Sequence, residues 1–197
     1  AKFATETQPL NKGKQQVVIG IDSGSTTTKI VAVRVNAETP TGDIVFTNYR
    51  LNLGNPIKAV ADGLNALKQE AALRGAELEI VGSCSTGYGE ELIMGAFGLD
   101  SGIIETMAHE RAAASLMPDV SFILDIGGQD MKASFVEKGA VVRMELNEAC
   151  SSGCGTFIQT FANNMGYSVG DFAQLACQSK APCDLGTRCT VFMNSKV

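Results

Sequence analysis

The chain has 197 residues, of which 45% are hydrophobic and 19% charged, a composition that excludes the disordered and fibrous classes of protein. Its formal net charge of -5 at pH 7 argues against a basic surface that could neutralise phosphates, so no nucleic-acid partner is expected. No apolar run approaches the ~20 residues that a membrane span requires, and no signal-peptide pattern is present, so we expect a cytoplasmic protein without a membrane partner.

The pattern along the chain predicts a mixed α/β fold. The first residues are polar and show no period, which predicts a linker over residues 1–16. Asn55 and Pro56 then suit the N-cap and first position of a helix. The other elements follow from apolar periodicity and from clusters of turn residues. We predict strands over residues 17–22, 29–35, 44–51, 78–82 and 121–126 and helices over residues 56–71 and 104–116.

An internal repeat organises these elements. Asp22 and Asp125 lie 103 positions apart (125 - 22), and so do Lys29 and Lys132 (132 - 29). VIGIDSGSTTTKIVAV therefore aligns with FILDIGGQDMKASFV without a gap between acid and lysine, each copy predicting a strand, an acidic glycine turn and a strand. We expect a first lobe over residues 17–118 and the start of an incomplete second lobe over residues 119–197.

The turns of the two copies suit phosphate binding. Gly24 allows the backbone to approach a phosphate closely, and the hydroxyls of the neighbouring residues can bond its oxygens. The predicted cofactor-binding residues are Gly24, Ser25, Thr26, Thr27, Lys29, Gly127 and Gly128. Asp22 would hold Mg2+ through water, whereas Asp125 and Gln129 would orient the metal or an attacking water. These three are the predicted catalytic residues.

Each turn taken alone also fits an ordinary hairpin, in which an acid and glycines commonly close the loop. The equal register of the two copies favours nucleotide binding over that interpretation. The site is not a Walker loop, because no GxxxxGK[ST] pattern occurs. In these two turns the sequence resembles the superfamily of actin, sugar kinases and Hsp70-type chaperones. The resemblance implies an actin-like (ribonuclease H-like) α/β ATPase fold with ATP and Mg2+ as ligands.

The six cysteines, in a chain without a secretory signal, favour reduced thiols or metal ligands over a disulfide scaffold. Cys150 directly precedes an apolar helical pattern, and Cys189 follows later. Two cysteines cannot complete a four-thiolate cluster site, but a symmetric dimer with both from each subunit can. Spacing also allows a different set that includes Cys154, Cys177 and Cys183, or simple burial as small apolar groups. Cys84 looks structural.

Five motifs in order, GIDSGSTTTK, STGYG, DIGGQD, NEACSSGCG and CTVFMNS, resemble the ATP-dependent activators of 2-hydroxyacyl-CoA dehydratases, within the BadF/BadG/BcrA/BcrD-type ATPases. The resemblance covers residues 17–197. It implies a homodimer that holds one 4Fe-4S cluster between its subunits, with Cys150 and Cys189 as the metal ligands. It further implies that ATP hydrolysis drives one electron to a 2-hydroxyacyl-CoA dehydratase, and that a ferredoxin or flavodoxin supplies that electron.

The chain departs from this family at the cluster segment. The family pattern resembles CAAGTGRF, and here Cys154 stands at the threonine position and Thr156 at the arginine position. The family's later glycine motif, which cradles adenosine, lies outside the chain. We therefore expect the 197-residue chain to be an excerpt of a longer polypeptide that is inactive in isolation.

Two other functions remain open on the sequence. A small-molecule (sugar) kinase of the same fold would carry a carboxylate base and would not need thiols. A non-catalytic nucleotide-binding scaffold would keep the fold without hydrolysing ATP. Iron content and ATP turnover distinguish the three hypotheses.

Overall fold

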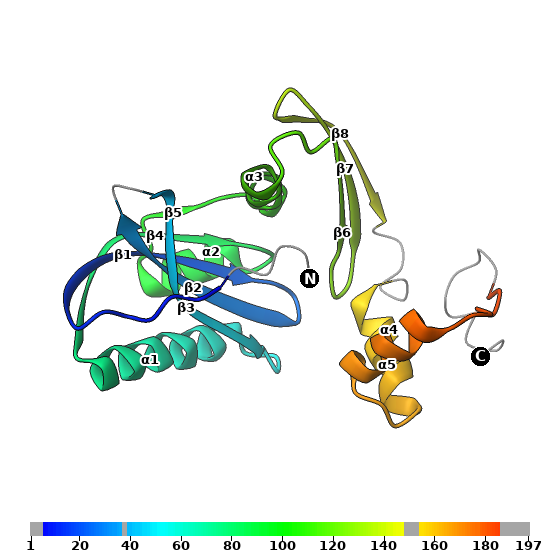
Figure 1. Cartoon of the computed structure of the whole chain (residues 1–197), viewed down its shortest axis with the longest axis horizontal. Coiled ribbons are helices and arrows are strands. Elements are labelled where there is room, and N and C mark those ends of the chain that lie inside the picture. The colour runs from blue at the N-terminus through cyan, green and yellow to red at the C-terminus, as the bar shows by residue number, and fades with distance from the viewer. Residues whose placement is uncertain (1–5, 37–38, 148–153, 186–197) are drawn as a thin grey trace. The chain divides into compact units, whose positions relative to one another are not determined.

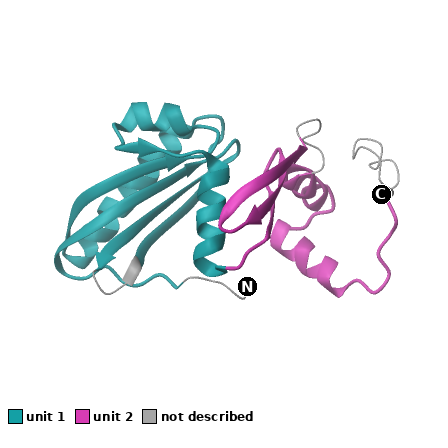
Figure 2. Cartoon of the chain, turned by 90° about the horizontal axis from the view of Figure 1, so that it is seen from above, with its two compact units in different colours: residues 1–118 teal, residues 119–197 magenta. Residues whose placement is uncertain are grey.

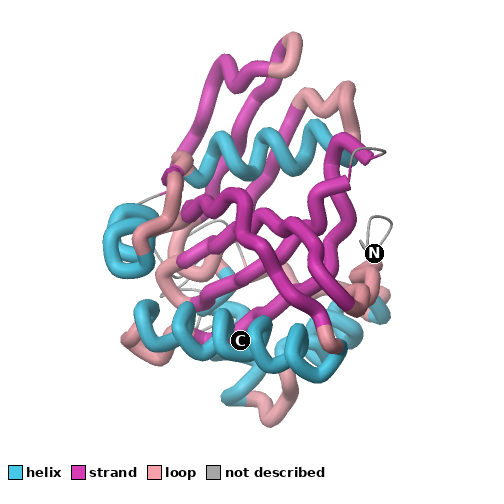
Figure 3. The backbone as a smooth tube through the Cα atoms, turned by 90° about the vertical axis from the view of Figure 1, so that its left-hand side faces the viewer, coloured by secondary structure: helices cyan, strands magenta, loops and turns pink. Residues whose placement is uncertain are grey.

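The computed structural model describes residues 6–36, 39–147 and 154–185. The chain divides into two compact units, unit 1 over residues 1–118 and unit 2 over residues 119–197 (Figure 2). Helices and strands along the backbone can be followed in Figure 3. None of the helices in the described ranges has the length and apolar character that a membrane crossing requires. The predicted mixed α/β pattern is confirmed.

Unit 1 is built on a five-stranded sheet with the order β3-β2-β1-β4-β5. Strand β1 pairs antiparallel with β2 and parallel with β4, so a hairpin and a crossover meet at the central strand. The strands are β1 (Gly13–Ser23), β2 (Thr27–Asn36), β3 (Thr39–Leu51), β4 (Ala76–Thr86) and β5 (Ser101–Gly102), and the helices are α1 (Pro56–Arg74), α2 (Glu90–Phe97) and α3 (Glu105–Leu116).

The core of unit 1 lies between the sheet and helices α1 and α2. Alternate residues of β1 point to one face and are buried there, as the period of a strand requires. Helix α1 lies along the sheet (Figure 1) and buries one stripe of small and apolar residues against it. The buried cluster contains Val17, Ile19, Ile21, Ile30, Ala32, Val60, Leu67, Ala71 and Ile93.

The start of the chain differs from the sequence prediction. Strand β1 begins at Gly13, four residues before the expected start at Val17, so the predicted linker overlaps the sheet. Gln15 is buried and Leu10 is only 5% exposed and belongs to the core. The polar composition hid this strand because its buried positions include a glutamine, and because pairing with β4 satisfies the backbone groups whatever the side chains are.

Unit 2 contains a three-stranded antiparallel sheet with the order β6-β7-β8 and two helices. The strands are β6 (Phe122–Ile126), β7 (Met131–Glu137) and β8 (Ala140–Asn147), and the helices are α4 (Gly155–Asn164) and α5 (Val169–Gln178). The register of β6 and β7 reproduces that of β1 and β2. Asp22 lies opposite Lys29, and Asp125 lies opposite Lys132. The duplicated hairpin is therefore present in the structure.

Candidate functional site

The turns of the two hairpins close in the same way. In unit 1 the amide of Gly24 donates to the carbonyl of Thr27 at 2.9 Å, and in unit 2 the amide of Gly127 donates to the carbonyl of Asp130 at 2.9 Å. These pairs correspond position for position at the offset of 103 residues (127 - 24 and 130 - 27). A Cβ on Gly127 would lie 2.7 Å from an Asp130 carboxylate oxygen, so a side chain there would displace the Asp130 carboxylate.

Asp22 provides the carboxylate of the first turn. Its Oδ2 accepts a hydrogen bond from Lys29 Nζ at 2.9 Å. Its Oδ1 is buried and, within the described part of the chain, has no hydrogen-bond partner. A carboxylate oxygen in this position accepts readily from water or from a hydrated cation. The predicted phosphate-loop residues Gly24, Ser25, Thr26, Thr27 and Lys29 all belong to this one hairpin.

A second segment of unit 1 lies against this turn. The amide of Gly89 donates to the carbonyl of Ser23 at 2.8 Å. Gly87 has a φ of +89°, and a Cβ added to it would lie 2.7 Å from both Asp22 Oδ1 and the Ser23 carbonyl oxygen. Residues 85–89, which were recognised in the sequence only as a family motif, therefore pack directly on the acid of the first turn.

Asn52 also contacts the first turn, and sequence reasoning missed it. Its side chain accepts from the Thr28 hydroxyl at 2.6 Å and donates to the Gly24 carbonyl at 2.8 Å. Its backbone amide donates to the Thr26 carbonyl at 2.9 Å. No periodicity marks Asn52, which follows the end of β3, and its repeat equivalent is a glycine, so the sequence carries no signal for its role.

In unit 2 the start of α4 packs on the second turn. The amides of Gly155 and Thr156 donate to the carbonyls of Gly127 at 2.9 Å and Gly128 at 3.1 Å. The Thr156 hydroxyl donates to the same Gly128 carbonyl. A Cβ on Gly155 would lie 3.2 Å from the Gly127 carbonyl oxygen, so a small residue is favoured at this approach.

The charged and polar residues of the second turn differ from one another in burial and in their partners. Lys132 forms an ion pair with Asp130 at 3.1 Å, and the Lys132 side chain is largely buried. Asp125 is half-buried on β6, and Gln129 is exposed in the turn. The second hairpin thus brings together the predicted residues Asp125, Gly127, Gly128 and Gln129. Their roles in catalysis stay predictions.

The predicted metal ligands Cys150 and Cys189 lie outside the described residues. Cys154 is buried at the N-cap of α4, whereas Cys177 and Cys183 are exposed. Within residues 154–185, these three thiols do not gather into a metal-binding group. Cys84 is half-buried, and its thiol donates to the Ser85 carbonyl at 3.5 Å.

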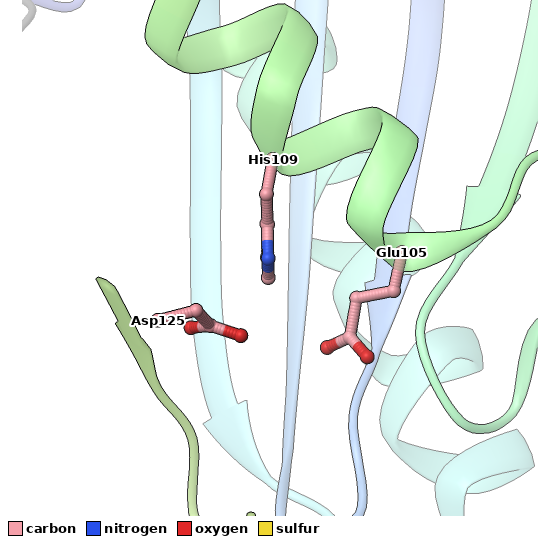
Figure 4. A group of neighbouring side chains, drawn as sticks. All are labelled: Glu105, His109 and Asp125. Atoms are coloured by element: carbon pink, nitrogen blue, oxygen red, sulfur yellow. The ribbon is translucent and has the colours of Figure 1, made fainter. Parts of the chain in front are cut away.

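The single histidine lies on α3, in the segment predicted as a helix. Figure 4 shows the side chains of Glu105 and His109, which come from successive turns of α3, and labels Asp125, which β6 carries. Residues four apart on a helix share one face.

The family model described as the BadF/BadG/BcrA/BcrD ATPase family matches residues 19–197. The (R)-2-hydroxyglutaryl-CoA dehydratase activating ATPase of Acidaminococcus fermentans is 28% identical over 179 residues, which cover 91% of this chain and 65% of that protein. The activator of lactoyl-CoA dehydratase of Anaerotignum propionicum is 29% identical over 182 residues, which cover 91% of this chain and 65% of that protein. The chain thus spans less than two thirds of the length of these relatives.

A solved structure agrees with these matches. The activator of the 2-hydroxyisocaproyl-CoA dehydratase from Clostridium difficile, with bound ADPNP, superposes with a TM-score of 0.76 at 28% identity. The superposition covers 91% of this chain and 63% of that one.

Proposed function

The chain belongs to the BadF/BadG/BcrA/BcrD ATPase family and has an actin-like ATPase fold, and from this premise we propose that it is the ATP-binding part of an activator. Its activity is ATP hydrolysis that drives one electron from a 4Fe-4S cluster to a 2-hydroxyacyl-CoA dehydratase-like acceptor. The observation that carries the proposal is the pair of acidic glycine turns with identical closing hydrogen bonds. The relatives named as dehydratase activators support the choice of acceptor.

The first turn suits the phosphate end of ATP with Mg2+. Bound there, Mg2+ would neutralise phosphate charge and orient the reacting oxygens. Asp22 would hold the hydrated ion, and its buried, unpartnered Oδ1 fits that role. Lys29 holds the other oxygen of the same carboxylate, so it orients Asp22 and adds positive charge beside the phosphates. The nucleotide named with the C. difficile relative, ADPNP, supports ATP as the ligand here.

The second turn suits the attacking water. Asp125 would orient that water or the metal, and the exposed amide of Gln129 would position it by hydrogen bonding. Phosphoryl transfer needs little beyond such positioning and charge stabilisation. Gly127 and Gly128 leave room for close approach of the phosphates.

The hydrogen bonds from α4 to the second turn link the nucleotide to the cysteines. Gly155 and Thr156 hold the carbonyls of Gly127 and Gly128, and Cys150 lies five residues before Gly155 (155 - 150). A shift of the turn on ATP binding or hydrolysis would therefore displace the start of α4. A two-state shift from 1:99 to 99:1 requires about 5.5 kcal/mol of differential binding, which charged contacts to a triphosphate can supply.

Cys150 and Cys189 of each subunit in a homodimer would supply the four thiolates that a 4Fe-4S cluster requires. Thiolates are the ligands that iron-sulfur clusters prefer. The cluster would hold a single low-potential electron, which a ferredoxin or flavodoxin supplies. The N-cap of α4 is Cys154, four residues after Cys150 (154 - 150), and the partial positive charge at this helix end would stabilise negative charge placed beside it.

The first prediction tests the ATPase site in the intact protein. Asp22→Asn and Asp125→Asn should each lower kcat for ATP hydrolysis by about two orders of magnitude or more, because metal and water positioning carry most of this chemistry. Phosphate release under anaerobic conditions measures it. Asp119→Asn, at an exposed position, is the matched control and should retain normal turnover.

Unchanged hydrolysis in both Asp variants would place the nucleotide site elsewhere. Phosphate that appears on a sugar instead of in water would support the kinase hypothesis.

The second prediction tests the cluster ligands. Cys150→Ala and Cys189→Ala should each abolish the iron-sulfur absorption of the anaerobically purified protein, because either change removes two of the four ligands in a dimer. Iron and sulfide analysis gives the stoichiometry. Cys84→Ala, at a half-buried position with a local hydrogen bond, is the control. A full cluster in Cys150→Ala would show that other cysteines bind the iron.

A further inference from the structure

We propose that Asn52 is a positioning residue that holds the first phosphate turn in its binding conformation, an inference that rests on the proposed ATP site. Asn52 is only 6% exposed and makes three hydrogen bonds to one hairpin. They reach the Thr28 hydroxyl, the Gly24 carbonyl and, through the backbone, the Thr26 carbonyl. These three contacts come from outside the turn and add to its own closing bond, from the Gly24 amide to the Thr27 carbonyl.

The Thr28 hydroxyl sets the direction of the Asn52 amide. An asparagine side chain carries an acceptor oxygen and a donor nitrogen, and the hydrogen-bond network decides which way each points. Oδ1 accepts from Thr28, which is fully buried. Nδ2 is therefore directed at the Gly24 carbonyl, at 2.8 Å.

Holding that carbonyl orients the next backbone amide. A peptide unit is planar and trans, so its C=O and N–H point in opposite directions. With the Gly24 carbonyl directed at Asn52, the N–H of Ser25 points away from Asn52. Backbone N–H groups fixed in a turn form the concave donors that anions bind. Asn52 thus aims a phosphate donor without touching the phosphate.

The second unit has the same device made from different atoms. The carbonyl equivalent to that of Gly24 belongs to Gly127, at the repeat offset of 103 (127 - 24). The backbone amide of Gly155 donates to it, and Gly155 is the equivalent of Asn52 at the same offset (155 - 52). In both units, the segment that follows the third strand of the repeat therefore fixes the same carbonyl. A packing accident would not place matching donors on matching carbonyls in both copies.

The experiment uses steady-state ATP hydrolysis by the intact protein. Asn52→Ala removes both side-chain hydrogen bonds, and Asn52→Asp keeps the acceptor for Thr28 but loses the donor to Gly24. Both should raise KM for ATP about tenfold, since loss of phosphate contacts weakens binding of the ground state as well as the transition state. Thr28→Ser, which keeps the hydroxyl, should have a KM for ATP near that of the parent protein. Asn65→Ala, at an exposed position on α1, is the matched control.

The KM distinguishes positioning from simple loss of folded protein. A purely structural defect would lower the active fraction, and so the apparent kcat, while leaving KM unchanged. An unchanged KM in both Asn52 variants would overturn the proposal.

A second measurement separates this inference from the proposed function. Hydrogen exchange of the Gly24 and residue-52 amides, which close the turn, should accelerate about tenfold in Asn52→Ala. A parent protein that hydrolyses no ATP would refute the proposed function, and exchange would still decide on Asn52. Faster exchange would support the holding of the turn, and unchanged exchange would overturn it.

Discussion

At the scale of single residues, the first turn is enclosed by glycines from a distant part of unit 1. Gly87 adopts a φ of +89°, which side chains rarely adopt, and it lies against Asp22 and Ser23. Gly89 donates its amide to the Ser23 carbonyl and has no space for a Cβ beside the Ser23 hydroxyl. The segment that contains Gly87 and Gly89 therefore packs its backbone against Asp22 and Ser23.

Gly87→Ala should destabilise the protein by more than about 2 kcal/mol, because it combines an unfavourable φ with a Cβ in collision with backbone. Chemical denaturation measures the free energy of unfolding. Gly98→Ala is the matched control, since Gly98 has a φ of +62° but open space around it. Gly98→Ala should lower the free energy of unfolding by only about 1 kcal/mol, the cost of a side chain at a positive φ. Equal losses in the two variants would contradict the steric argument.

At the scale of elements, helix α1 starts next to Asn52, which contacts the first turn, and packs one face into the core. It begins after a tight turn in which the Asn55 amide donates to the Asn52 carbonyl at 2.8 Å. The Asn55 side chain accepts from the Lys58 amide at 2.9 Å, Pro56 occupies the first position, and Gly75 ends the helix with a φ of +64°. These local signals set the length of the helix, and its buried stripe sets its place on the sheet.

Asn55→Ala should lower the free energy of unfolding by about 1 kcal/mol, because it removes the acceptor for an amide at the helix start. Asn65→Ala lies in the exposed interior of the same helix and should change stability by no more than about 0.5 kcal/mol. Thermal unfolding of both variants gives the comparison. A loss in Asn65→Ala as large as in Asn55→Ala would mean that the cap contributes nothing specific.

At the scale of the whole molecule, the two units differ in how much apolar surface they bury. Unit 1 has a cluster of fully buried aliphatic residues, including Val17, Ile30 and Val60. In the described part of unit 2, strands β6 and β8 leave many apolar side chains exposed, with Ile126 at 57%. Burial of apolar surface is the main favourable term in folding, so the units should differ in local stability.

Hydrogen exchange in the 197-residue chain should therefore show β1 (Gly13–Ser23) protected at least about tenfold more than β8 (Ala140–Asn147). Strand β8 lies at a sheet edge and all of its residues are exposed, so its amides open with little loss of buried surface. Mass spectrometry of peptides from the two strands measures the difference. Equal protection would mean that unit 2 is stabilised by contacts other than its own core.

The sequence by itself determined the two hairpins. Asp22 and Lys29 are joined by a short turn, and in an antiparallel pair such residues face each other wherever the hairpin lies in the fold. The same holds for Asp125 and Lys132. The repeat spacing, the helix start at Asn55 and the family membership all depend on patterns that are visible along the chain.

Only the tertiary structure decided what surrounds those turns. Asn52 reaches Gly24 across 28 positions, and Gly155 reaches Gly127 across the same separation. Gly87 meets Asp22 across a parallel strand pair that requires α1 as its crossover. Such contacts arise when elements pack together, and nothing in the sequence of either element indicates that the two will be in contact. The polar residues that begin β1 are part of the sheet because they pair with β4. The hydrogen bonds of that pairing join backbone groups, so they form whatever the side chains are.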